Sequence, residues 1–152
     1  MAQLQRHAAI LLVLLAVVAP SAAQETYERL PSIELPAELD RVLREYEVAW
    51  EEGESEALAA LFTADGFVPS GPGWIRGRGP IAAHYDETGG DLRLRAHAYG
   101  VADSVGYIVG AYGYGEGATE TDRGKFLLAL RQSADGKWLI AADLDNSNRT
   151  DP

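Results

Sequence analysis

Residues 39–81 read LDRVLREYEVAWEEGESEALAALFTADGFVPSGPGWIRGRGPI, and this stretch decides the fold. In its first part, apolar residues recur at spacings of three and four, which predicts one amphipathic helix that ends at Gly53. Ser55 suits the N-cap of a second helix that carries LAALF, and residues 64–66 break that helix. Two successive helices therefore open the predicted domain.

Strands and a third helix follow. Residues 67–69 and 74–76 have the pattern of two short strands, and Pro80 suits the first position of a helix that stops at Gly89. Four longer strands are predicted at 92–101, 104–115, 122–133 and 137–146. Their many glycines permit bulges and strong curvature. This order predicts an α+β fold in which a strongly curved antiparallel sheet wraps three N-terminal helices.

Three pieces of the sequence resemble a known family. They are EYEVAWEEGESEALAALF in the first two helices, RGRGPI at the start of the third, and the closing DGKWLIAADLDNSN. In this order they resemble the nuclear-transport-factor-2-like superfamily, which includes steroid delta-isomerases and SnoaL-like polyketide cyclases. The resemblance covers residues 35–148. It implies a cone-shaped fold with a pocket for a small organic molecule between the first helix and the sheet.

The catalytic pattern of the isomerases is only partly present. By resemblance, Tyr46 matches the tyrosine that donates a hydrogen bond to the developing oxyanion. The carboxylate that moves the proton falls at Ser70, and the second acid falls at Leu128. A serine without a partner base does not transfer protons near neutral pH, and leucine donates no hydrogen bond. The familiar steroid isomerisation is therefore disfavoured.

Two other acids are candidates for catalysis. Asp143 and Asp145 alternate on the last strand, and by resemblance their side faces the pocket. Their spacing of about 7 Å along a strand is short enough for one charge to raise the pKa of the other carboxyl. A general acid or base needs such a pKa, with Tyr46 as hydrogen-bond donor. The alternative is that both acids lie at a solvated rim in ordinary ion pairs.

The predicted pocket combines the helix-one aromatics with inward strand positions. By resemblance, Tyr107 and Val109 face inward, whereas Tyr112 and Tyr114 face outward with Ile108 and offer a homodimer interface. The full set of predicted lining residues is Tyr46, Trp50, Phe62, Phe67, Tyr85, Tyr107, Val109, Phe126, Leu128 and Leu139. Trp50 has the alternative reading of an ordinary core aromatic.

Composition limits the partners. A formal net charge of −10 disfavours nucleic acid, and the absence of cysteine excludes thiol catalysis and thiolate metal sites. His84 and His97 lack partners at metal-ligand spacing, so we expect no metal and no cofactor.

The N-terminus predicts export. A basic start, a short apolar run and small residues up to Ala23 indicate a signal peptide at 1–23, and the run is too short to span a bilayer. A flexible leader at 24–34, the domain at 35–148 and a tail at 149–152 follow. The mature protein is thus expected to be secreted or periplasmic, without stable membrane insertion.

Three functions remain open from the sequence. The first is an exported small-molecule-binding domain with a hydrophobic pocket between helix one and the sheet. The second is a cofactor-free enzyme of the isomerase, cyclase or dehydratase type that uses pocket carboxylates. The third is a dimeric assembly module with a filled pocket. An elevated carboxyl pKa inside a cavity would favour the enzyme.

Overall fold

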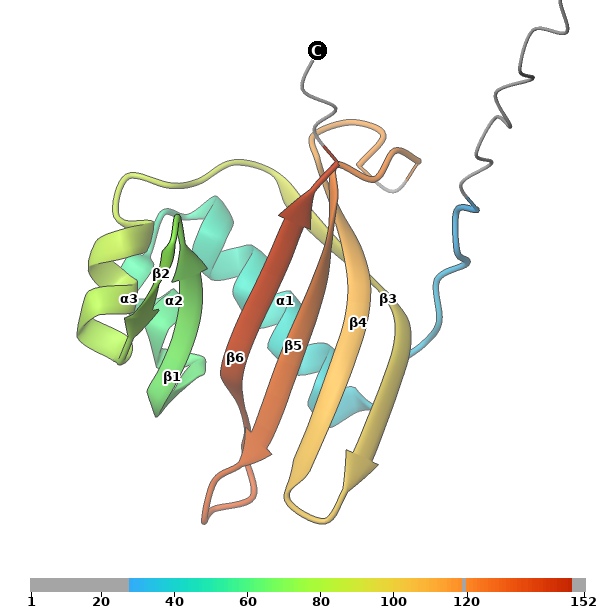
Figure 1. The fold of residues 1–152 in the computed structure, drawn as a ribbon. Coiled ribbons are helices and arrows are strands. Elements are labelled where there is room, and N and C mark those ends of the chain that lie inside the picture. Colours follow the sequence, from blue (N-terminus) through green and yellow to red (C-terminus); the bar gives the residue numbers. More distant parts are fainter. Residues whose placement is uncertain (1–27, 119, 149–152) are drawn as a thin grey trace, which may run out of the picture.

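The computed structural model describes residues 28–118 and 120–148 (Figure 1). The predicted signal peptide, the first part of the leader and the tail at 149–152 lie outside these residues. Within the described part of the chain, no helix is long and apolar enough to cross a membrane.

The structure confirms an α+β architecture with a curved, unclosed sheet of six strands. The helices are α1 (Ala37–Glu51), α2 (Ser55–Ala60) and α3 (Arg78–Tyr85). The strands are β1 (Phe62–Ser70), β2 (Gly73–Arg76), β3 (Leu92–Ala102), β4 (Val105–Tyr114), β5 (Gly124–Gln132) and β6 (Trp138–Ser147). The four long strands begin and end within two residues of their predicted bounds. The cone shape stays a prediction.

One feature of the sheet differs from the prediction. Its strand order is β2-β1-β6-β5-β4-β3, and β1 pairs with β6 in parallel, so the sheet is mixed rather than purely antiparallel. β1 is also longer than expected, because it starts directly after α2 and runs beside β6. That pairing joins segments far apart in the chain, and local sequence patterns do not report it.

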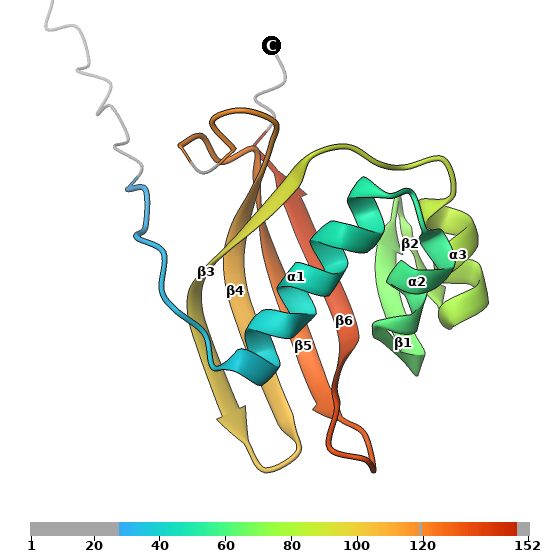
Figure 2. The same cartoon turned by 180° about the vertical axis from the view of Figure 1, so that it is seen from behind.

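Helix α1 crosses one face of the sheet, as Figure 2 shows from behind. Its periodic apolar residues are buried as predicted, and Gly53 ends the turn after the helix with a φ of +69°. Glu47 ties the helix to the sheet, because its Oε1 accepts a hydrogen bond of 2.5 Å from the Leu94 N–H. Arg44 donates to the other carboxylate oxygen of Glu47. This contact fixes the height of α1 above β3.

The inner face of the sheet, the face that α1 covers, has an apolar half. We define the apolar half as the first turns of α1 and the strand residues beneath them: Leu39, Val42, Leu43, Ile108, Leu130, Trp138 and Ile140. All of these side chains are buried. The hydrophobic effect of this burial supplies much of the stability of the fold.

Two β-bulges shift the side chains that follow them. In β6, Leu130 of β5 pairs with Ile140 and Ala129 pairs with Ala142, so Ala141 is an extra residue. In β3, Ala96 and Ala98 pair with consecutive residues of β4, so His97 is extra. An extra residue inverts the in–out alternation beyond it. Ala98 is consequently exposed, whereas Leu92, Leu94 and Ala96 before the bulge are buried.

The leader segment contacts the edge strand β3. Residues 28–34 have no helix or strand, but the Ile33 N–H donates to the Ala96 carbonyl at 2.9 Å. Arg95 donates from Nη1 to the Ser32 hydroxyl at 2.7 Å, and its Nη2 pairs with Asp122 at 2.6 Å. These contacts hold the leader along the free edge of the sheet.

Candidate functional site

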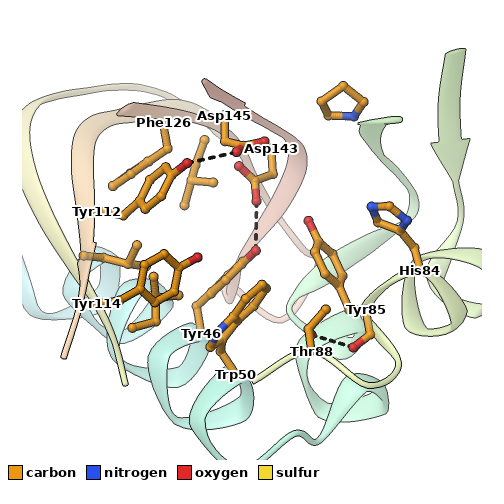
Figure 3. A pocket seen from close by; sticks show the side chains of 14 residues that line it. Tyr46, Trp50, His84, Tyr85, Thr88, Tyr112, Tyr114, Phe126, Asp143 and Asp145 are labelled. Carbon is orange, nitrogen blue, oxygen red and sulfur yellow. Dashed lines mark hydrogen bonds between the residues drawn. The ribbon is translucent and has the colours of Figure 1, made fainter. Parts of the chain in front are cut away.

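A cavity of about 310 Å³ lies at the end of the inner face opposite the apolar half (Figure 3). It is lined by the last turns of α1, the end of β1, the end of α3 and the loop after it, and the inner faces of strands β3 to β6. The lining residues are Tyr46, Trp50, Pro69, His84, Tyr85, Thr88, Leu92, Leu94, Tyr112, Tyr114, Phe126, Leu128, Asp143 and Asp145. We call this set the cavity half.

Asp143 is the buried acid of the cavity. Only 7% of its surface is exposed, and the Tyr46 hydroxyl donates to its Oδ2 at 3.1 Å (Figure 3). Burial raises the pKa of Asp143 to about 7, the negative charge of Asp145 adds to this, and the hydrogen bond from Tyr46 opposes it. The carboxyl is therefore close to half protonated near neutral pH.

Asp145 lies two residues further along β6 and is exposed. The Tyr112 hydroxyl lies 3.4 Å from its Oδ2. Burial and the charge of Asp145 raise the pKa of Tyr112 to about 12. The pKa values of Tyr46 and Tyr85 are also raised, first by burial and then by the charge of Asp143. All of these phenols thus keep their protons at neutral pH and remain hydrogen-bond donors.

Five aromatic rings form a continuous wall around Trp50. Its ring stacks on Tyr46 with centroids 6.4 Å apart and an interplanar angle of 15°. The edge of Tyr85 meets Trp50 at 5.8 Å, and Tyr114 lies 6.5 Å away on another side. Tyr112 continues the wall, 5.9 Å from Tyr114. Trp50 therefore contacts three cavity aromatics and lines the site, in addition to its partial burial against the core.

The loop after α3 orients Tyr85. The N–H and the hydroxyl of Thr88 both donate to the Tyr85 carbonyl, at 3.2 Å and 2.6 Å. They satisfy a carbonyl that the end of the helix leaves without a partner. Helix α3 ends at Tyr85, earlier than the predicted stop at Gly89, and Tyr85 lines the cavity.

The structure brings seven of the predicted site residues together at the cavity: Tyr46, Trp50, Tyr85, Phe126, Leu128, Asp143 and Asp145. Five others lie elsewhere. Phe62 is fully buried in the core, and the ring of Phe67 packs against Trp74 at 5.4 Å. Leu139 precedes the bulge at Ala141. In that part of β6 the buried residues are Trp138 and Ile140, so Leu139 points away from the inner face of the sheet.

The predicted orientation of β4 is inverted. Ile108 lies opposite the buried Leu128 of β5 and is itself fully buried, so it faces inward and not outward. Alternation along the strand then turns Tyr112 and Tyr114 into the cavity, and it turns Tyr107 and Val109 to the outer face. The outer face therefore lacks the two tyrosines that were predicted to offer a homodimer interface.

Seven lining residues were not in the predicted set: Pro69, His84, Thr88, Leu92, Leu94, Tyr112 and Tyr114. A signal for the tyrosines was available, because the run Ile108, Gly110, Tyr112, Tyr114 continues the buried alternation once Ile108 is placed inside. Within the residues that the structure describes, no group of three His, Cys, Asp or Glu side chains is placed to hold a metal ion. His84 is the single histidine of the lining.

No protein-family model and no curated protein matches this chain. Solved structures do. A protein of unknown function from Mycobacterium tuberculosis is 21% identical, with a TM-score of 0.62, and the match covers 74% of this chain and 75% of that one. A ketosteroid isomerase-like protein from Erwinia carotovora atroseptica is 18% identical, with a TM-score of 0.59, over 74% of this chain and 95% of that one.

A third similar structure is described as an NTF2-like protein with a cystatin-like fold, from Novosphingobium aromaticivorans. It is 18% identical, with a TM-score of 0.59, and the match covers 75% of this chain and 82% of that one. At these identities the likeness concerns the fold alone. The chain has the nuclear-transport-factor-2-like fold, which the resemblance of residues 35–148 predicted.

Proposed function

We propose that this protein is a cofactor-independent enzyme of the isomerase, cyclase or dehydratase type, in which Asp143 moves a proton on a small organic molecule. The observation that carries the proposal is a buried carboxyl with a pKa of about 7 on the wall of a cavity. Such a group supplies both its acidic and its basic form near neutral pH, which general acid–base catalysis requires. We further propose that it acts after export, on the basis of the signal-like residues 1–23.

In this proposal Tyr46 is a positioning residue. It holds Oδ2 of Asp143, so Oδ1 is the oxygen that takes the proton from the substrate. A C–H bond next to a carbonyl breaks, its electron pair stays on the substrate as an enolate, and the proton moves to Asp143. In a substrate whose enolate is conjugated with a C=C bond, the proton returns from Asp143 to the far carbon of that system, the double bond shifts, and the isomerisation is complete.

The developing enolate oxygen needs a donor, and tyrosine hydroxyls can supply it. Leu128 stands where the isomerase pattern has its second acid, so that position contributes none. The hydroxyls of Tyr85 and Tyr114 belong to the cavity wall (Figure 3). Because burial raises the pKa of both phenols, they stay protonated and can donate.

A binding domain without chemistry is the alternative that the sequence left open. It needs the same cavity and the same apolar side chains, among them Leu92, Leu94 and Phe126. It has no need of a carboxyl whose ionised form is disfavoured by burial. The environment of Asp143 therefore favours the enzyme.

The dimeric assembly proposed from the sequence now rests on different residues of the outer face. Val109, Leu127 and Leu144 are direct cross-strand partners on β4, β5 and β6 and form one apolar row. Tyr107 and Val105 precede Val109 on the same face of β4, and both are exposed. Sedimentation of the wild type against Leu127→Lys tests this proposal, since a dimer on this face would dissociate in the variant.

The test of the enzymatic proposal is hydrogen exchange on carbon. Purified protein is incubated in D2O with a panel of small ketones, and deuterium uptake next to the carbonyl is followed by mass spectrometry. We expect Asp143→Asn to lower the exchange rate by about 10²- to 10⁴-fold. We also expect the wild-type rate to rise with pH through about 7, as Asp143 ionises.

Asp135→Asn is the matched control, because Asp135 is an exposed acid in the turn before β6. It should leave the exchange rate unchanged. Exchange that is as fast in Asp143→Asn as in the wild type would refute the assignment of Asp143 as the proton-transfer group.

A further inference from the structure

We propose that the cavity selects an organic cation, an ammonium compound held between the aromatic wall and Asp145. This inference deepens the proposed function, since it names the substrate class of the same site. The charge of the lining, its rings, its polar groups and the different depths of its two acids lead to it.

Carboxyl groups outnumber basic side chains in the lining, where His84 is the one basic residue. Asp143 and Asp145 contribute carboxyl groups, and among the described residues no lysine or arginine lines the cavity. The nearby Arg93 pairs with Asp91 at 2.6 Å and with Glu51 at 3.4 Å. An anionic ligand would thus meet negative charge without a counter-charge, whereas a cation would gain a partner.

The rings have the composition of a cation-binding cage. Tyr46, Trp50, Tyr85, Tyr112 and Tyr114 all line the cavity, and neighbouring rings lie 5.8–6.5 Å apart. A cation within about 6 Å of a ring centroid is attracted by the negative face of the ring, most strongly by tryptophan. Quaternary ammonium groups are recognised by such aromatic cages.

The polar groups are too many for a neutral, apolar ligand. A pocket for such a ligand has a small number of polar groups among apolar walls. Here four tyrosines and two carboxyl groups surround one cavity. Each hydroxyl oxygen and each carboxylate oxygen can accept a hydrogen bond, which an ammonium or its polarised methyl groups can provide.

Asp143 and Asp145 lie at different depths, and the proposal gives them different roles. Asp143 is buried and held by Tyr46, so it belongs to the proton-transfer step. Asp145 is exposed and lies beside Tyr112 at the mouth of the cavity. An entering cation meets Asp145 and the rings of Tyr112 and Tyr114 first. The reactive carbon of the same molecule then points inward to Asp143.

Binding of three probes of nearly equal shape tests the proposal. They are choline, its neutral isostere 3,3-dimethylbutan-1-ol and the anionic 3,3-dimethylbutanoate. Affinities are measured near neutral pH by tryptophan fluorescence and by chemical-shift changes in NMR spectra. We expect choline to bind about 10-fold more tightly than the neutral alcohol, and the anion to bind least.

Three variants locate the selectivity. Asp145→Asn and Tyr114→Leu should each lower the affinity for choline several-fold and leave the affinity for the alcohol unchanged. Tyr114→Phe keeps the ring and should keep most of the affinity for choline, and unchanged binding of the alcohol by Tyr114→Leu shows that the leucine variant is folded. Asp135→Asn, a charge change outside the cavity, should have no effect.

Two outcomes would overturn the proposal. One is equal or no binding of the three probes, and the other is selectivity for choline that survives Asp145→Asn and Tyr114→Leu together. The probes undergo no proton transfer, so these results do not depend on the role of Asp143. If the probes gave one of these two results and deuterium exchange on neutral ketones still required Asp143, the cation proposal would be refuted and the proposed function would be supported.

Discussion

The two halves of the inner face share helix α1 and strands β4, β5 and β6 but differ in chemistry. In the apolar half, the first turns of α1 pack on β4, β5 and β6 through aliphatic side chains and Trp138. In the cavity half, Tyr46 and Trp50 of the same helix face carboxyl and phenol groups across an open space. One set of elements can therefore be closely packed at one end and hold polar groups around a cavity at the other, because the change needs no new helix or strand.

The boundary between the halves lies at one residue of β6. Trp138 and Ile140 point inward before the bulge, and Asp143 points inward after it. Without the extra Ala141, alternation would turn Leu144 to the cavity and both acids to the outer face. The bulge therefore converts an apolar strand into the acidic wall of a site.

The largest expected effect is the loss of packing in the apolar half. Leu130→Ala should lower the free energy of unfolding by about 2–5 kcal/mol, because Leu130 is only 3% exposed on the inner face of β5. Leu127→Ala is the matched control on the same strand, where the leucine is 37% exposed on the outer face, and we expect a loss below about 1 kcal/mol. Urea unfolding measures both, and equal losses would contradict the assignment of the two faces.

In the cavity half, Asp143→Asn should stabilise the protein at about pH 8. In the folded protein the carboxyl stays protonated up to about pH 7, whereas its ordinary pKa is 3.8. As pH rises between these values, the unfolded chain ionises first and the wild type loses stability, by up to about 4 kcal/mol in total. The variant lacks this loss, so its advantage should be absent near pH 4, grow as the pH rises, and reach its full size above about pH 7.

Urea unfolding of the wild type and of Asp143→Asn across this pH range checks the prediction. Glu47 has a raised pKa through burial as well, but it is present in both proteins and cancels in the difference. A wild type that gains stability relative to the variant as pH rises would show that Asp143 is ionised in the folded state.

Gly110 marks the place where the two halves meet on β4. A Cβ at this position would overlap the carbonyl of Arg95 and the ring of Phe126, which lines the cavity. Gly110→Ala should therefore cost about 1–3 kcal/mol. Gly79→Ala in α3 is the control, since nothing lies within 4 Å of the added methyl group, and it should be neutral or slightly stabilising. Thermal unfolding compares the two variants, and a neutral Gly110→Ala would contradict the tight packing of Phe126.

The smallest expected effect concerns the coupling of the two acids. The charge of Asp145 contributes to the raised pKa of Asp143, after burial. Asp145→Asn should therefore lower the pKa of Asp143 while leaving it above its ordinary value. Carbon-13 NMR of the Asp143 carboxyl measures the shift. An unchanged pKa would mean that burial alone sets it.

The sequence predicted the elements well because their causes are local. The spacing of Leu39, Val42, Leu43 and Tyr46 determines a helix face, and Gly53 ends the helix by its own conformational freedom. Asp143 and Tyr46 were predicted to share the site, and they are hydrogen-bonded.

What the sequence could not predict depends on pairing between strands. The inward side of β4 is set by Leu128 of β5, which lies opposite Ile108, so Tyr107 and Val109 were placed on the wrong face. Leu139 was misplaced because a bulge at Ala141 has no sequence signature of its own. In both cases the alternation of side chains along the strand could be recognised in the sequence. Which of the two alternating faces points to the core could not.

The position of β6 in the sheet has a consequence for how the molecule forms. This strand follows all the others in the chain, yet it lies between β1 and β5 and pairs Phe62 with Ile140. Such distant partners meet late in folding, because closing a long loop costs entropy before any contact compensates for it. Asp143 and Asp145 are both on this last strand, so a chain that has not yet inserted β6 has neither a finished sheet nor the two carboxyl groups of the cavity. Under the proposed function, incompletely folded molecules would therefore be inactive, and activity would report complete folding.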